Sequence, residues 1–136
     1  MAQTSYALYL SKFVDAYAAR GVNVTAVMVQ NEPYAGGCNY PKCQWTGEQM
    51  RAFVRDYLGP RFAADHAAGS PAPAEVWLGT LNTDDFAEAP YAVLSDLDAA
   101  AQIGGVALQW AGKGIVGRVA RTWPSLKVGV RRSERE

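Results

Sequence analysis

The feature that most constrains the fold is a run of apolar and β-branched residues that stops abruptly at polar side chains and a proline. Residues 24–33 read VTAVMVQNEP. β-branched enrichment favours a strand, and apolar residues on both faces are typical of a strand buried in a parallel sheet. Pro33 cannot donate to a neighbouring strand and favours an extended backbone at Glu32, so the strand is expected to end there.

The carboxylate of Glu32 is therefore expected at the C-terminal end of a buried strand, which in α/β barrels is the end that carries reacting groups. A single Glu at a strand end is ordinarily just a solvated side chain. Gln30 and Asn31 weaken that interpretation, because three consecutive polar side chains rarely follow a buried strand without a ligand to meet.

Three further strands are predicted at residues 76–81, 105–110 and 126–130, each separated from the one before by helical patterns. An apolar stripe over residues 6–17 predicts a helix with Ser5 as N-cap and Gly21 at its end. Thr46 and Gln49 form a capping box before a second stripe, which Gly59-Pro60 is expected to break or restart. Shorter helical pieces follow, one capped by Ser95 or Asp96, and a last helix covers residues 115–123.

This alternation predicts an α/β fold with about four parallel strands. A doubly wound nucleotide-binding fold is the rival, but no Gly-rich phosphate loop follows any predicted strand. Polar and aromatic residues at the strand ends favour a barrel with its site at the C-terminal rim. At 136 residues the chain is one domain's worth, well short of the roughly 250 residues of a complete (β/α)8 TIM barrel. We therefore expect a partial barrel.

The composition argues against several functional classes. Thirteen basic and 13 acidic residues give zero net charge, so nothing suggests a nucleic-acid partner, and no apolar run is long enough for a membrane span. The only histidine, His66, is far from Cys38 and Cys43, so no metal site is predicted. The sequence predicts no cofactor. For the two cysteines, a short-loop disulfide and two free thiols both remain open.

Two aromatic residues lie in the loop after the first strand. Tyr40 and Trp45 suit sugar binding, because the C–H faces of a pyranose pack on aromatic rings. The alternative for Trp45 is that its ring only packs the loop against the barrel rim.

Residues 26–33, followed by Tyr40-Pro41, Gln44-Trp45-Thr46 and Gln49-Met50-Arg51, resemble glycoside hydrolase family 30. That family includes glucosylceramidases, β-1,6-glucanases and xylan-cleaving enzymes. The resemblance runs from Tyr6 to Lys127. It covers roughly the third helix to the seventh strand of an eight-fold barrel, so residues 1–136 are interpreted as a single fragment of the catalytic domain.

The resemblance implies that Glu32 is the general acid/base and that Asn31 binds the sugar 2-hydroxyl. It places Gln109 and Trp110 beside the glycone, where many members have His-Trp, so Gln109 is a departure that bears on substrate. Trp45 is a further candidate for substrate binding.

The nucleophile of the family is a Glu in a Ser/Thr-Glu-x-Glu run after the strand that begins Leu-Lys. Glu134 has that pattern here but lies two residues later than expected, and counting from Lys127 places Arg132 at the family position. The strand at 126–130 is expected in the same parallel sheet as the strand at 24–30, with Glu134 beyond the rim.

The predicted function is retaining β-glycoside hydrolysis on a β-glucan, an oligosaccharide or a glycolipid. The alternative is a catalytically inactive or carbohydrate-binding remnant of such a barrel. The compartment of the fragment is undetermined, whereas the parent protein is expected to be secreted.

Overall fold

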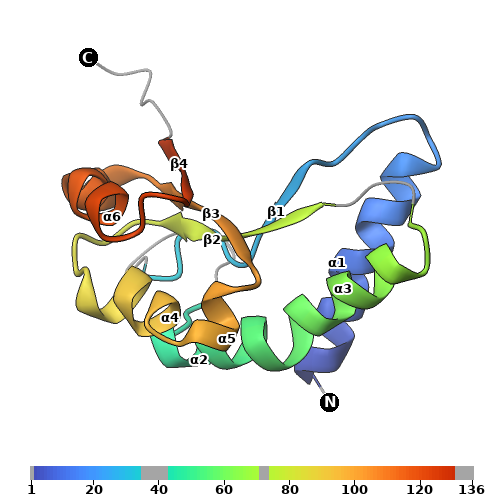
Figure 1. The fold of residues 1–136 in the computed structure, drawn as a ribbon, viewed down its shortest axis with the longest axis horizontal. Helices are drawn as coiled ribbons and strands as arrows, with labels where there is room; N and C mark the ends of the chain where they lie inside the picture. Colours follow the sequence, from blue (N-terminus) through green and yellow to red (C-terminus); the bar gives the residue numbers. More distant parts are fainter. Residues whose placement is uncertain (1, 35–42, 71–73, 131–136) are drawn as a thin grey trace.

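The computed structural model describes residues 2–34, 43–70 and 74–130. Four parallel strands form one sheet in which each strand pairs with the next one in the sequence (Figure 1). Helical segments connect consecutive strands, which confirms the predicted parallel β/α arrangement. The strands are β1 (Ala26–Met28), β2 (Glu75–Leu81), β3 (Ile103–Leu108) and β4 (Lys127–Val130).

β1 is shorter than the predicted strand, although hydrogen bonds to β2 continue beyond both ends of β1. The Glu75 N–H donates to the Thr25 carbonyl at 2.9 Å, and the Thr80 N–H donates to the Gln30 carbonyl at 3.0 Å. β3 ends at Leu108, so the prediction that Trp110 closes this strand was wrong. The backbone of Trp110 has φ +51°, which cannot continue an extended strand.

The first helix begins earlier than the sequence predicted. Helix α1 covers Ala2–Ala18, so Ser5 lies inside it and the N-cap prediction was wrong. Nothing in the residues before Ser5 disfavours helix, and the helix therefore extends toward the N-terminus. The predicted stop is confirmed: Gly21 has φ +78°, and the Val22 N–H bonds the Tyr17 carbonyl at 3.0 Å, as in a Schellman motif.

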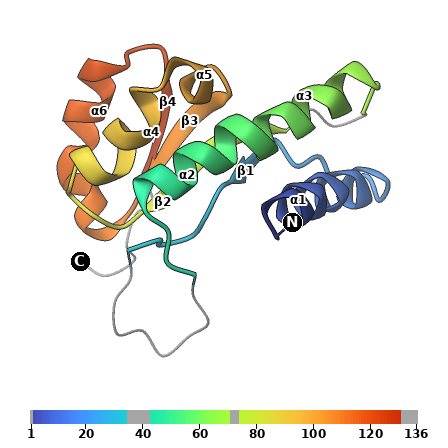
Figure 2. The ribbon, with the colours of Figure 1, turned by 90° about the horizontal axis from the view of Figure 1, so that it is seen from below.

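An α-helix restarts at Gly59 with Pro60 in its first turn, as predicted, and it continues the preceding helical segments as one long rod (Figure 2). The capping box of Thr46 and Gln49 starts the rod, as predicted. Just before Pro60 the rod widens into a π-helical turn, after which the Gly59 N–H donates to the Val54 carbonyl. The proline ring would clash with the carbonyl four residues earlier in a regular α-helix, and the wider turn avoids that clash. The rod consists of α2 (Gly47–Phe53), η1 (Val54–Leu58) and α3 (Gly59–Ala67).

The remaining helical segments are short. Pro90 lies in a second π-helical turn, which relieves the same clash. Ser95 and Asp96 were the two predicted N-caps, and Asp96 is the one that caps the short helix Leu97–Ala100. The segments are η2 (Ala87–Tyr91), α4 (Ala92–Leu94), α5 (Leu97–Ala100), the 3-10 helix η3 (Trp110–Ile115) and α6 (Val116–Thr122).

The hydrophobic core lies between the sheet and the helices, and α2 to α5 lie below the strands in Figure 1. Val29 of the first strand region, Leu78 of β2 and Val106 of β3 are fully buried there, together with Met50 and Phe53 of α2. These side chains join residues from distant parts of the chain into one cluster, which holds the strand ends in a common frame.

The opposite face of the sheet is only partly covered among the described residues. The prediction that both faces of the first strand are buried was wrong for this face, because Met28 is 37% exposed. The Trp77 indole spans the neighbouring strands: a Cβ on Gly105 would lie 2.6 Å from it, and one on Gly129 2.9 Å. Its Nε1 donates to the Glu75 carboxylate at 2.9 Å. In a closed barrel this face would be the interior.

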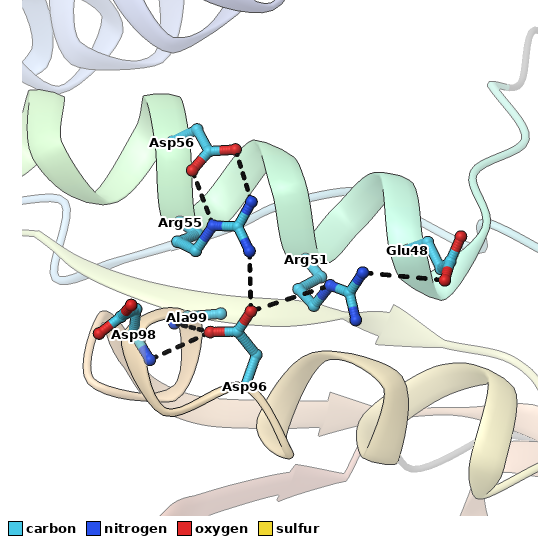
Figure 3. A network of polar contacts seen from close by, with 7 residues as sticks. All are labelled: Glu48, Arg51, Arg55, Asp56, Asp96, Asp98 and Ala99. Atoms are coloured by element: carbon cyan, nitrogen blue, oxygen red, sulfur yellow. Dashed lines mark hydrogen bonds and ion pairs between the residues drawn. The ribbon is translucent and has the colours of Figure 1, made fainter.

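A polar network ties the α2–η1 rod to α5 (Figure 3). The Asp96 carboxylate accepts from the backbone N–H groups of Asp98 and Ala99, which start α5. Its other oxygen accepts from Arg55 Nη1 at 2.9 Å and lies 3.9 Å from Arg51 Nε. One carboxylate therefore both caps a helix and binds it to the neighbouring rod.

Candidate active site

The ends of the first three strands bring the polar candidates together. Asn31 and Glu32 follow β1, Thr80 lies near the end of β2, and Gln109 and Trp110 follow β3. Because the strands are parallel and adjacent, their carboxyl ends meet at one edge of the sheet. Four of the predicted site residues thus converge, although up to 79 residues separate them in the sequence (110 minus 31).

Two residues of this group have a left-handed backbone. Glu32 has φ +46° and Trp110 has φ +51°, the only such values outside glycine among the described residues. This conformation costs a non-glycine residue on the order of 1–3 kcal/mol and clusters at functional sites. The Glu32 N–H donates to the Thr80 carbonyl at 3.2 Å, which holds the turn against β2.

The Glu32 carboxylate accepts hydrogen bonds from both residues that follow β3. Gln109 Nε2 lies 2.9 Å from Glu32 Oε1, and Trp110 Nε1 donates to the same oxygen. Hydrogen bonds to an ionised carboxylate are shorter and stronger than those between neutral groups. Gln109 is only 2% exposed, whereas Trp110 is 60% exposed. The Glu32 carboxylate is therefore held by one buried donor, Gln109, and by the accessible indole ring of Trp110.

Asn31 is fixed in the same group. Its Oδ1 accepts from the Thr80 hydroxyl at 2.7 Å and lies 3.4 Å from Gln109 Nε2. The side chain is otherwise exposed at the edge of the sheet. A carboxamide beside a carboxylate, both hydrogen-bonded to the buried Gln109, can bind a hydroxyl-bearing ligand while the carboxyl group exchanges a proton with it.

Trp45 lies outside this group. Its ring packs edge-on against Phe53 at 5.1 Å between centroids and contacts Tyr6 at 6.2 Å. Its Nε1 points to Cys43 Sγ, 3.0 Å away. The packing interpretation of Trp45 therefore describes its observed contacts, and a role in substrate binding stays a prediction.

Several predictions concern residues outside the described part of the chain. Glu134, Arg132, Cys38 and Tyr40 all fall there. The strand that precedes Glu134 is described: β4 pairs in parallel with β3, in the same sheet as β1, which confirms the predicted topology.

Sequence reasoning missed Thr80 and two glycines. Gly79 has φ +57°, and the register between β2 and β3 shifts between Leu78 and Leu81, so a β-bulge sits just before the site. A Cβ on Gly112 would lie 2.3 Å from the Leu81 carbonyl oxygen, so only glycine allows η3 to approach β2 this closely. An isolated glycine inside a strand pattern is a signal of a bulge, and it was available at Gly79.

Residues 1–120 match the glycosyl hydrolase family 30 TIM-barrel domain. The chain belongs to this family. Lysosomal acid glucosylceramidase of Mus musculus is 35% identical over 112 residues, which cover 78% of this chain and 20% of that protein. Endo-1,6-beta-D-glucanase neg1 of Aspergillus fumigatus is 31% identical over 81 residues, covering 60% of this chain and 16% of that protein.

Solved structures show the same fold. The endo-beta1,6-glucanase BT3312 superposes with a TM-score of 0.78 at 24% identity, covering 96% of this chain and 29% of that one. SrfJ from Salmonella typhimurium superposes with a TM-score of 0.76 at 24% identity, covering 98% and 31%. The family 30 chain is thus part of a TIM barrel, as predicted, and it spans a fifth or less of the length of the two curated relatives above.

Within the described residues, no group of three or more His, Cys, Asp or Glu side chains could hold a metal ion. Over the same ranges, no helix combines the length and apolar character needed to cross a bilayer.

Proposed function

We propose that this chain is the central part of a retaining β-glycoside hydrolase in which Glu32 is the general acid/base. The observation that carries the proposal is the Glu32 carboxylate itself. It stands on a left-handed backbone at the end of a strand and accepts from Gln109 Nε2 at 2.9 Å and from the Trp110 indole. Family membership supports the same assignment.

The proposed chemistry requires a proton transfer in each of two steps. Protonated Glu32 donates its proton to the glycosidic oxygen as that bond breaks, while a second carboxylate forms a bond to the anomeric carbon. Glu32, now ionised, then takes a proton from the water that attacks the glycosyl-enzyme, which restores the acid and releases the sugar. Retention requires roughly 5–5.5 Å between the two carboxyl groups.

Glu134 is our candidate for that second carboxylate. It follows β4, which ends at Val130 opposite Leu108 in the sheet. It also lies two residues later than the family pattern, and such a shift moves a side chain about 6.6 Å along an extended chain. Glu134 can therefore act as the nucleophile only where the chain around it compensates for this offset.

The proposed substrate is a β-linked glucoside in a glucan, an oligosaccharide or a glycolipid. The two curated relatives above are named for glucosylceramide and for 1,6-β-D-glucan cleavage. We place the glycone against Trp110, with Asn31 at its 2-hydroxyl. Gln109 is a neutral amide, and we assign the difference from the usual histidine to substrate choice.

The test uses the full coding region around this chain, with Glu32 replaced by Ala. Glu32→Ala should lose most activity on natural β-glucans, because their alkoxide leaving groups need a proton. It should still form the glycosyl-enzyme from a dinitrophenyl β-glucoside, whose leaving group departs without one. Mass spectrometry of the trapped intermediate and rates on both substrates measure this. Equal losses of activity on both substrates would mean that Glu32 is the nucleophile or has only a structural role.

The exposed Trp110 indole favours a second candidate, a carbohydrate-binding remnant without hydrolysis. Such a protein would bind gluco-oligosaccharides in a Trp110-dependent way and show no turnover by the complete polypeptide. Titration calorimetry with wild type and Trp110→Ala, run beside the hydrolysis assay, separates the two functions.

A further inference from the structure

The Thr80 hydroxyl joins the three residues that we assign to the reaction. A hydroxyl has one hydrogen to donate and two lone pairs that accept. Thr80 donates to Asn31 Oδ1 at 2.7 Å. Its oxygen accepts from Gln109 Nε2 at 3.3 Å and from the Glu32 backbone N–H at 3.4 Å. The whole capacity of the hydroxyl is used within the site.

These contacts determine which edge of the Asn31 carboxamide faces outward. Its oxygen receives hydrogen bonds from Thr80 and, at 3.4 Å, from Gln109 Nε2. Rotating the amide by half a turn would set its NH2 group against the donor of Gln109. Oδ1 therefore stays inward, and the exposed edge of Asn31 carries Nδ2, which only donates.

A local irregularity of β2 directs Thr80 to this position. Side chains alternate between the two faces of a strand, so Val76 and Leu78, both buried in the core, would place residue 80 in the core as well. Gly79 has φ +57°, and the register to β3 shifts between Leu78 and Leu81. The bulge turns Leu81 into the core and Thr80 toward Asn31.

We propose that Thr80 is a positioning residue that holds Asn31 as a hydrogen-bond donor toward the glycone. The site would thereby select a sugar with an acceptor oxygen next to its anomeric carbon. This inference rests on the proposed function of the same site, because it needs Asn31 to face a sugar. Thr80 itself acts through Asn31 and touches no substrate.

The first experiment measures the orientation of Asn31 without any reaction. Two hydroxyl-free variants of the 136-residue chain, Thr80→Val and Thr80→Ala, are compared with Thr80→Ser, which keeps the hydroxyl. The NMR order parameter of the Asn31 side-chain amide should fall to below about 0.6 in both hydroxyl-free variants. It should remain high in wild type and Thr80→Ser. Backbone amide spectra away from the site check that each variant keeps the fold.

The second experiment compares a β-glucoside with its 2-deoxy counterpart, using the complete polypeptide. Losing one oriented hydrogen bond should lower kcat/KM for the β-glucoside about tenfold in Thr80→Val and Thr80→Ala. The 2-deoxy substrate should be cleaved equally by all forms. An ordered Asn31 amide in the hydroxyl-free variants, or equal losses on both substrates, would overturn the positioning role. Absence of hydrolysis by wild type, with a disordered amide in those variants, would overturn the proposed function alone.

Discussion

Gly112 lets the η3 turn pass closer to the end of β2 than any other residue allows. A Cβ at this position would lie 2.3 Å from the Leu81 carbonyl oxygen and 3.2 Å from the Leu81 carbonyl carbon, atoms of the backbone that cannot rotate away. We expect Gly112→Ala to lower the free energy of unfolding by about 1–3 kcal/mol. Denaturant unfolding measures this. Because Trp110 opens η3, the indole should also shift relative to Glu32.

Gly114 provides the matched control in the same short helix. A Cβ there would meet only Asp84 Cβ at 3.8 Å, an ordinary contact. Gly114→Ala should therefore change the free energy of unfolding by less than about 0.5 kcal/mol. Similar destabilisation by both substitutions would mean that chain flexibility, and not the approach to β2, explains the glycine.

The attachment of α5 to the long rod depends on one carboxylate. Asp96 caps α5 through the Ala99 and Asp98 N–H groups and accepts from Arg55 on η1 (Figure 3). Asp96→Ala should lower the midpoint of thermal unfolding clearly more than Asp98→Ala. The Asp98 carboxylate takes no part in these contacts, and only its backbone N–H donates. Circular dichroism of both variants measures the difference, and equal midpoints would contradict a stabilising role for the network.

The same network makes stability depend on pH. Hydrogen bonds from the Ala99 N–H and from Arg55 lower the pKa of Asp96, and the hydrogen bond from Arg55 lowers the pKa of Asp56. A folded-state pKa below the unfolded value stabilises the fold above the unfolded pKa, and this stabilisation is lost as pH falls through the folded pKa. The midpoint temperature of thermal unfolding should therefore decrease when the pH is lowered below about 4. In Asp96→Ala the drop should be smaller, and an identical pH profile would argue against the contribution of Asp96.

At the scale of the whole molecule, the helices among the described residues cover only one face of the sheet. The other face carries Met28, Trp77 and the Glu75–Lys127 ion pair. We expect the purified 136-residue chain to hydrolyse no aryl β-glycoside above background, because a closed barrel supplies much of the pocket in this fold. A nitrophenyl β-glucoside assay measures this. Turnover that disappears in Glu32→Gln would show that the chain assembles a working site by itself.

The sequence by itself determined the elements and their order. β-branched runs predicted the four strands, apolar stripes predicted the helices, and the capping box at Thr46 and Gln49 predicted where the long rod begins. The stop at Pro33 marked Glu32 as a residue at a strand end. These features depend on neighbours within a few positions in the chain, and such local preferences can be recognised in a single sequence.

The tertiary structure decided how the side chains of the site meet. The bonds from Gln109 to Glu32 and from Thr80 to Asn31 join residues 77 and 49 positions apart. They depend on the register between strands, and the bulge at Gly79 shifts that register by a local backbone change. The tertiary structure also decided that the Trp45 ring packs on Phe53. The physical reason is that a strand pattern specifies which residues alternate, whereas register and bulges depend on packing against strands far away in the sequence.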